Sequence, residues 1–218
     1  MWEVIGKVRI KMDKLLNSTN ELTQTLVTFL SLPTYDNSPK IIASRTLCGV
    51  SFEHANSVNI LIELGNFTSA LGILRMQYET LVKSIWAFYS ASENSIQKLQ
   101  SELSNDTAKW ADKLPTLNEM LDELNDKAPQ AALSPLIEFR DYSWKPLSSY
   151  IHGGIHAVSR HKNGYPEQLL TQALKSSNGL LVMAGMMLVI LSGDKNQSGK
   201  VPIIQKRFAD CCSDLRST

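Results

Sequence analysis

Two of the four histidines lie in one short segment that also carries arginines and tyrosines. The segment runs from Arg140 to Arg160 and reads RDYSWKPLSSYIHGGIHAVSR. If the chain is helical after Pro146, then His152, His156 and Arg160 follow one another at intervals of four residues and share one helix face. Imidazole can both accept and donate a proton near neutral pH. This spacing is therefore typical of a general acid–base pair beside a cation.

Two other interpretations of this segment stay open. Each residue of the Gly153–Gly154 pair would cost a helix about 1 kcal/mol relative to Ala, unless another backbone or a ligand must approach closely. In a purely structural interpretation the glycines allow tight helix packing, and the histidines cap carbonyl groups or lie at a boundary. A zinc site would need further ligands beside His152 and His156, and no nearby Cys or Asp has a typical spacing. We expect neither a metal nor a cofactor.

A second candidate is Arg75, which lies within the most regular helical pattern of the chain. At 100° per residue its side chain falls on the edge of the apolar stripe, so its guanidinium should be partly buried and should need a partner. Glu79 is one turn further on and could form a local ion pair, as a structural partner. Alternatively, Arg75 reaches the His152 region and supplies positive charge to an anionic ligand.

The elements that position these residues are predicted to be helices. The clearest pattern begins near Asn66, after Gly65, and places apolar residues at spacings of three and four. Its seam consists of Leu71, Leu74, Tyr78, Leu81, Ile85 and Phe88. The preceding segment 39–64 has the same spacing in Leu47, Val50, His54, Val58 and Leu61. The two segments predict an antiparallel helical hairpin.

Helical patterns also flank this hairpin, whereas no set of alternating strands appears. Further helices are expected over 2–32, after Ser92, on both sides of Pro115, in short pieces divided by Pro135, Pro146 and Gly153–Gly154, from Pro166 to Leu191, and after Pro202. Loops are expected at 33–39 and 193–201. The sequence thus predicts an all-α fold, a single domain over 1–218 that forms a helical bundle of about seven to nine helices.

The composition is that of a soluble globular protein, with 43% hydrophobic residues and a formal net charge of +1. This near-zero charge argues against a broad basic field, so any contact with nucleic acid must use a local basic surface. The cysteines Cys48, Cys211 and Cys212 are odd in number and do not form a disulfide framework. The apolar run from Leu180 to Leu191 is shorter than a membrane span and predicts a buried helix. We expect a cytoplasmic protein with no membrane partner.

Two motifs resemble a known group of proteins. The segment LRMQYETLVKSIW, which contains Arg75 and Glu79, precedes WKPLSSYIHGG, which contains His152. Together they resemble an uncharacterised bacterial all-α family with an Arg-x3-Glu helix and a Tyr-x-His-Gly-Gly segment. That family resembles the HEPN superfamily, helical domains that often dimerise and include metal-independent RNases of toxin and phage-defence systems. The resemblance implies an HEPN-like fold, a homodimer, and RNA or a nucleotide as ligand.

The resemblance also implies roles for particular residues. Active HEPN nucleases carry Arg, then four to six residues, then His; the nearest fit here places Lys145 six intervening residues before His152, with lysine in place of arginine. The catalytic candidates are His152, His156, Lys145 and Tyr150. The phosphate-binding candidates are Arg75, Arg160 and Arg140. The alternative is a non-catalytic helical protein, either an antitoxin-like or immunity-like interaction protein with a partner protein, or a scaffold that binds RNA or a nucleotide.

Overall fold

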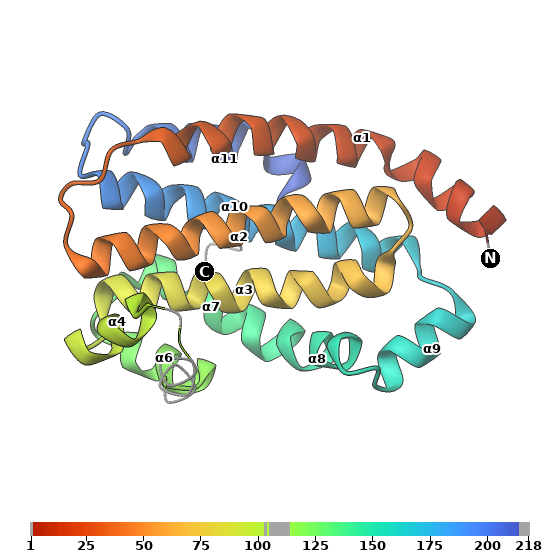
Figure 1. The fold of residues 1–218 in the computed structure, drawn as a ribbon. Coiled ribbons are helices and arrows are strands. Elements are labelled where there is room, and N and C mark those ends of the chain that lie inside the picture. Colours follow the sequence, from red (N-terminus) through yellow and green to blue (C-terminus); the bar gives the residue numbers. More distant parts are fainter. Residues whose placement is uncertain (1, 103, 105–113, 214–218) are drawn as a thin grey trace.

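The computed structural model describes residues 2–102, 104 and 114–213, with side chains from Met12 onward. Every regular element in these ranges is a helix, so the expected all-α class is confirmed. The four long helices are α1 (Trp2–Val27), α2 (Pro39–Glu63), α3 (Phe67–Tyr89) and α10 (Glu167–Ser192). They run side by side, and the shorter helices from α4 to α9 lie along the α3 side of this group (Figure 1).

The shorter helices connect and cover the long ones. They are η1 (Thr28–Ser31), α4 (Glu93–Gln100), α6 (Leu117–Leu124), α7 (Gln130–Phe139), η2 (Arg140–Trp144), α8 (Lys145–Ile151), α9 (Ile155–Asn163), α11 (Lys200–Arg207) and η3 (Ala209–Cys211). α6 begins just after Pro115, with Thr116 as a capping box residue. The helical residues expected before Pro115, at 105–113, lie outside the described part of the chain.

The predicted hairpin of α2 and α3 is present, and Gly65 forms its turn with a φ of 80°. The α3 seam is confirmed from Leu71 to Ile85, whereas Phe88 is only partly buried. The predicted α2 seam is wrong apart from Val58: Val50 is exposed, and Leu47, His54 and Leu61 are only partly buried. The residues that face α3 instead are small or polar, including Ser44, Cys48 and Ser51.

Hydrogen bonds across the hairpin explain this difference. The hydroxyl of Ser84 on α3 lies 3.1 Å from the Ser44 hydroxyl and 3.1 Å from the Cys48 sulfur, and it donates to the Ser44 carbonyl at 2.9 Å. Small side chains let two helices approach closely, and a buried polar group costs little when it is paired. The buried seam of α2, which includes Cys48, Ser51, Ala55 and Ile62, therefore lies one position further along the chain than the predicted one.

The region before the histidines is a nearly continuous helical run. α7, η2 and α8 follow one another directly from Gln130 to Ile151. Pro135 lies inside α7, so the expected division there is wrong, whereas the expected boundary at Pro146 coincides with the start of α8. η2 is a π-helical turn, in which the usual hydrogen-bond pattern is already interrupted. Pro146 lies in the first turn of α8, directly after it, where a missing N–H costs little.

α10 crosses the centre of the bundle. It is long and apolar enough to span a bilayer by length and composition, but 72% of its apolar window is buried inside the protein. The predicted buried helix is therefore confirmed, and this burial is typical of the core helix of a soluble protein. Gly193 ends α10 in the left-handed conformation, and α11 begins at Lys200.

Candidate functional site

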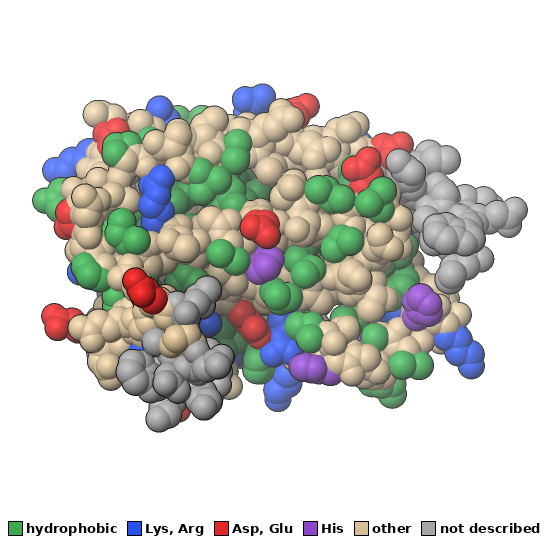
Figure 2. Space-filling view, viewed as in Figure 1, with side chains coloured by type: hydrophobic (Ala, Val, Ile, Leu, Met, Phe, Trp, Pro, Cys, Tyr) green, Lys and Arg blue, Asp and Glu red, His purple; other side chains and the backbone are tan. Residues whose placement is uncertain are grey.

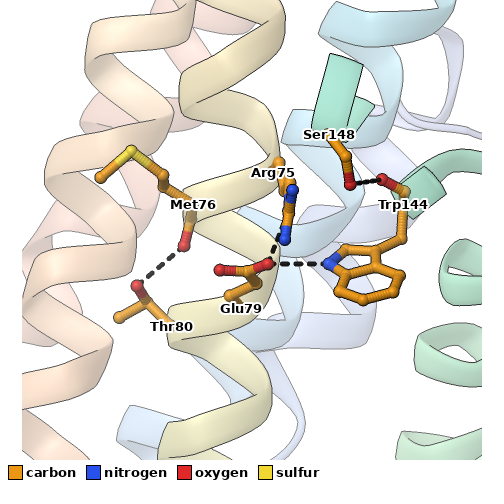
Figure 3. Close-up of polar contacts among 6 residues, drawn as sticks. All are labelled: Arg75, Met76, Glu79, Thr80, Trp144 and Ser148. Atoms are coloured by element: carbon orange, nitrogen blue, oxygen red, sulfur yellow. Dashed lines mark hydrogen bonds and ion pairs between the residues drawn. The ribbon is translucent and has the colours of Figure 1, made fainter. Parts of the chain in front are cut away.

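Arg75, Glu79 and Trp144 form one polar cluster between α3 and η2 (Figure 3). Arg75 Nε donates to Glu79 Oε1 at 2.6 Å, and Trp144 Nε1 donates to the same oxygen at 2.7 Å. The guanidinium carbon lies 4.8 Å from the centre of the Trp144 ring, within range of a cation–π interaction. The Arg75 side chain is only 14% exposed. Arg75 thus pairs with Glu79, as the first of the two interpretations expects.

Arg75 lies toward the end of α8 that is remote from His152. Trp144 immediately precedes α8, whereas His152 follows its last residue. The seven residues of α8 lie between them, so the two positions are about 12 Å apart along the axis. At the other end, Ile151 contacts α3 close to Gly72, where an added Cβ would lie 3.5 Å from Ile151 Cγ1. α8 therefore runs antiparallel to α3, and the Arg75 guanidinium stacks on Trp144.

The two candidate histidines lie on either side of a tight turn. The backbone N–H of His152 donates to the Ser148 carbonyl at 3.2 Å and closes α8, while His156 is in the first turn of α9. Both side chains are exposed. The expected division at Gly153–Gly154 is confirmed, so the helix ends between the two histidines, and His152, His156 and Arg160 do not share one helix face. Only His156 and Arg160 lie on the same helix.

The glycine pair accounts for this break. Gly153 has a φ of 62°, which side chains rarely adopt. A Cβ on Gly154 would lie 2.6 Å from Ser149 Oγ. That hydroxyl accepts a hydrogen bond from the backbone N–H of His156 at 2.9 Å, and the Ser149 carbonyl accepts from Gly154 N–H at 2.7 Å. Ser149 and the glycines therefore fix the orientation of α9 relative to α8.

Tyr150 points inward, next to His156. It is buried, and its ring centre lies 6.3 Å from that of His156. Burial raises the pKa of the Tyr150 hydroxyl, and the neighbouring Tyr165 acts in the same direction, whereas the charge and hydrogen bond of Arg160 oppose this rise. Tyr165 is itself hydrogen-bonded to Thr68 at the start of α3. The Tyr150 hydroxyl is thus engaged by Arg160 below the surface.

The remaining candidates lie at the start of this region. Lys145 is exposed in the first turn of α8. Arg140 Nε donates to Asp141 Oδ1 at 2.8 Å, and this hydrogen bond raises the pKa of Arg140. Each of the three candidate arginines therefore has a protein partner: Glu79 for Arg75, Asp141 for Arg140 and Tyr150 for Arg160.

One stretch of the chain lacks acidic residues, although the net charge of the whole chain is close to zero. The stretch 142–166 contains three Lys or Arg residues and three of the four histidines, but no Asp or Glu. It forms part of η2, α8 and α9, and cationic and histidine side chains gather over these helices along the lower edge of Figure 2. A search for acid-free stretches in the sequence would have found this local basic surface.

Comparison with known proteins places most of the chain in one family. Residues 48–214 match a family described as a family of unknown function, DUF6988. The chain belongs to the DUF6988 family. In this DUF6988 protein the matched range includes α3, η2, α8 and α9 in full, and with them all the candidate residues. No curated protein and no solved structure matches the chain.

Two pockets in the described part of this DUF6988 protein lie away from the candidate residues. One, of about 680 Å³, is formed by α1, α10 and η3, and the other, of about 560 Å³, lies between α2 and α4. Neither is lined by a candidate residue. Within the described ranges, no three His, Cys, Asp or Glu side chains are grouped so that they could hold a metal ion. The histidines thus belong to an open surface.

Proposed function

We propose that this protein binds RNA through the exposed side of η2, α8 and α9, and that it is a metal-independent endoribonuclease. The observation that carries the proposal is the acid-free stretch 142–166, which exposes His152 and His156 on either side of one turn. A local positive surface attracts the phosphate backbone even when the total charge of a protein is close to zero. The formal net charge of +1 makes such a local surface necessary.

The proposed reaction uses the 2′-hydroxyl of RNA as the nucleophile. One imidazole, of His152 or His156, accepts the proton of this hydroxyl as its oxygen attacks the adjacent phosphorus. The other imidazole protonates the 5′-oxygen that leaves. The products are a 2′,3′-cyclic phosphate and a free 5′-hydroxyl. Lys145, two helical turns before His152 on the same face and also exposed, would stabilise the negative charge of the phosphorane.

The resemblance to HEPN proteins supports the catalytic form of this proposal. Metal-independent RNases of toxin and phage-defence systems belong to that superfamily. The Tyr-x-His-Gly-Gly segment carries the resemblance to an uncharacterised all-α family, and that family in turn resembles HEPN proteins. An HEPN-like fold, a homodimer and a cytoplasmic location are parts of the same proposal. In a homodimer, two such basic surfaces could contact one RNA strand.

A second candidate function is RNA binding without cleavage. The partners of the arginines favour it, because Arg75, Arg140 and Arg160 each have a protein partner that competes with a phosphate. The burial of Tyr150 favours it as well, since this hydroxyl is not presented to a substrate. In this function Lys145 and the histidines would contact the phosphate backbone as positioning groups.

The two functions are distinguished by measuring binding and cleavage on the same samples. Purified protein is incubated with single-stranded RNA and transfer RNA in the presence of a chelator, and the products are tested for 2′,3′-cyclic phosphate ends. We expect cleavage by the wild type and a loss of about 100-fold or more in His152→Ala and His156→Ala. His161→Ala is the control for the cleavage step, because it removes an exposed imidazole from the helix of His156 that takes no part in the proposed proton transfers, so cleavage should persist.

The outcomes separate the candidates. Because His152 and His156 are exposed, their alanine variants should keep the melting temperature of the wild type. RNA binding without cleavage by any sample would overturn the catalytic proposal and support the second function. No binding of RNA at low salt would overturn both functions.

A further inference from the structure

We infer that Tyr142 is a stacking platform for an unpaired base, and that the substrate class is therefore single-stranded RNA. This inference rests on the proposed RNA-binding function and deepens it. Tyr142 lies in the π-helical turn η2 and is 79% exposed, which is unusual for a large aromatic side chain. It is also the first residue of the acid-free stretch.

The packing of η2 and α8 against α3 leaves a defined outer face. Trp144, Leu147 and Tyr150, spaced by three residues, point inward: Trp144 binds Glu79, and the other two are buried. The opposite side of the same helical run is therefore turned to solvent. Its exposed residues include Tyr142, Lys145 and His152.

These three exposed side chains lie along one side of the helix in an order suited to a nucleic-acid strand. His152 follows Tyr142 by ten positions, which corresponds to a distance of about 15 Å along the helix axis. A strand of about four stacked nucleotides, at 3.4 Å each, has a similar length. Lys145 lies between them, where a phosphate of the same strand would pass. A cation that contacts the backbone, combined with an aromatic ring on which a base stacks, is typical of proteins that bind single strands.

The chemistry of stacking selects the substrate class. In an RNA duplex every base is already stacked within the helix, so its faces cannot reach a tyrosine ring on a protein surface. An unpaired base can turn outward and stack on the ring whatever its identity, because every base has a π face. π-helical turns also occur frequently at functional sites, and Tyr142 is at the centre of one.

An exposed tyrosine can also be an ordinary surface residue, and the chain provides a matched control for that case. Tyr35, in the connection before α2, is 74% exposed and lies outside the acid-free stretch. Its ring packs against Gly193, where a Cβ would lie 2.6 Å from the ring. Tyr35→Ala therefore removes an exposed ring of the same kind at a place that the proposed RNA strand does not reach.

The test measures affinity by fluorescence anisotropy with short, unstructured 2′-O-methyl RNA, which cannot be cleaved through its 2′-hydroxyl, and with a duplex of the same sequence. We expect the wild type to prefer the single strand and Tyr142→Ala to bind it about 5- to 100-fold more weakly. Tyr142→Phe, which keeps the ring, and Tyr35→Ala should bind the single strand like the wild type. Affinity for the duplex should not change in Tyr142→Ala.

Three results would overturn the inference, and one of them also overturns the proposed function. If Tyr142→Ala binds the single strand as well as the wild type, the platform is absent although RNA binding stands. If the wild type prefers the duplex, the substrate class is wrong. If the wild type binds neither RNA, the proposed function fails, and the role of Tyr142 fails with it. Melting temperatures of the variants verify that each is folded.

Discussion

Trp144 donates its indole N–H to Glu79 across 65 positions of the sequence, at a distance of 2.7 Å. The accepting oxygen also pairs with Arg75 on the same helix, so a single carboxylate of α3 holds the guanidinium of Arg75 and binds the indole of η2. This contact determines which side of η2 faces inward. Because Trp144 points toward α3, Tyr142 and Lys145 point toward solvent.

Removing this carboxylate should destabilise the fold. We expect Glu79→Ala to lower the free energy of unfolding by about 1–3 kcal/mol, because it leaves the shielded guanidinium of Arg75 and the indole N–H of Trp144 without an acceptor. Urea denaturation measures the change. The control is Asp141→Ala, which breaks the more exposed pair with Arg140 and should cost no more than about 0.5 kcal/mol. Equal effects of the two substitutions would contradict this assignment.

Two glycines should respond to alanine with opposite signs. Gly153→Ala should cost about 1–2 kcal/mol, because its φ of 62° is unfavourable for a residue with a Cβ even though the space around it is open. Gly49, inside α2, also has open space, and there Ala should stabilise the protein by about 0.5–1 kcal/mol. The urea concentration at which half of the protein is unfolded, measured for each variant and for the wild type, shows whether each substitution raises or lowers the stability. Stabilisation by Gly153→Ala would show that this turn adopts another conformation.

His54 should make the stability of the protein depend on pH. Burial lowers the pKa of this half-buried histidine, and Glu53 opposes the shift only in part. The unfolded chain therefore takes up the proton first as the pH falls below about 6.5, and protonation favours the unfolded state. The contribution of neutral His54 to the stability of the folded protein is therefore fully present above about pH 6.5. It is lost progressively as the pH falls toward the pKa that His54 has in the folded protein.

The measurement compares the free energy of unfolding at about pH 7.5 and at about pH 5.5. Both values lie above the pH range in which Asp and Glu carboxylates take up protons. We expect His54→Gln to lose less stability over this interval than the wild type does. His161→Gln, which removes an exposed histidine of α9, is the control and should retain the wild-type difference. An unchanged pH dependence in His54→Gln would rule out His54 as its source.

The helix that sequence analysis located best is α3, where large apolar side chains make up most of the buried face. In α3 the recurrence of large side chains from Leu71 to Ile85 identified the buried face. In α2 the predicted seam was one position away from the buried one, which combines apolar residues such as Phe52 and Ile62 with Ser44 and Cys48, the contacts of Ser84. From the sequence alone, polar residues of this kind are predicted to be exposed. Their hydrogen-bond partner belongs to another helix, so the sequence pattern does not reveal it.

The sequence by itself determined the all-α class, the hairpin turn at Gly65 and the presence of two histidines beside a glycine pair, because these depend on residues within a few positions of one another. Tertiary structure decided which side of η2 and α8 is exposed, and that Trp144 shares the Glu79 carboxylate with Arg75. Contacts such as that between Glu79 and Trp144 join segments far apart in the chain, and local propensity carries no information about such partners.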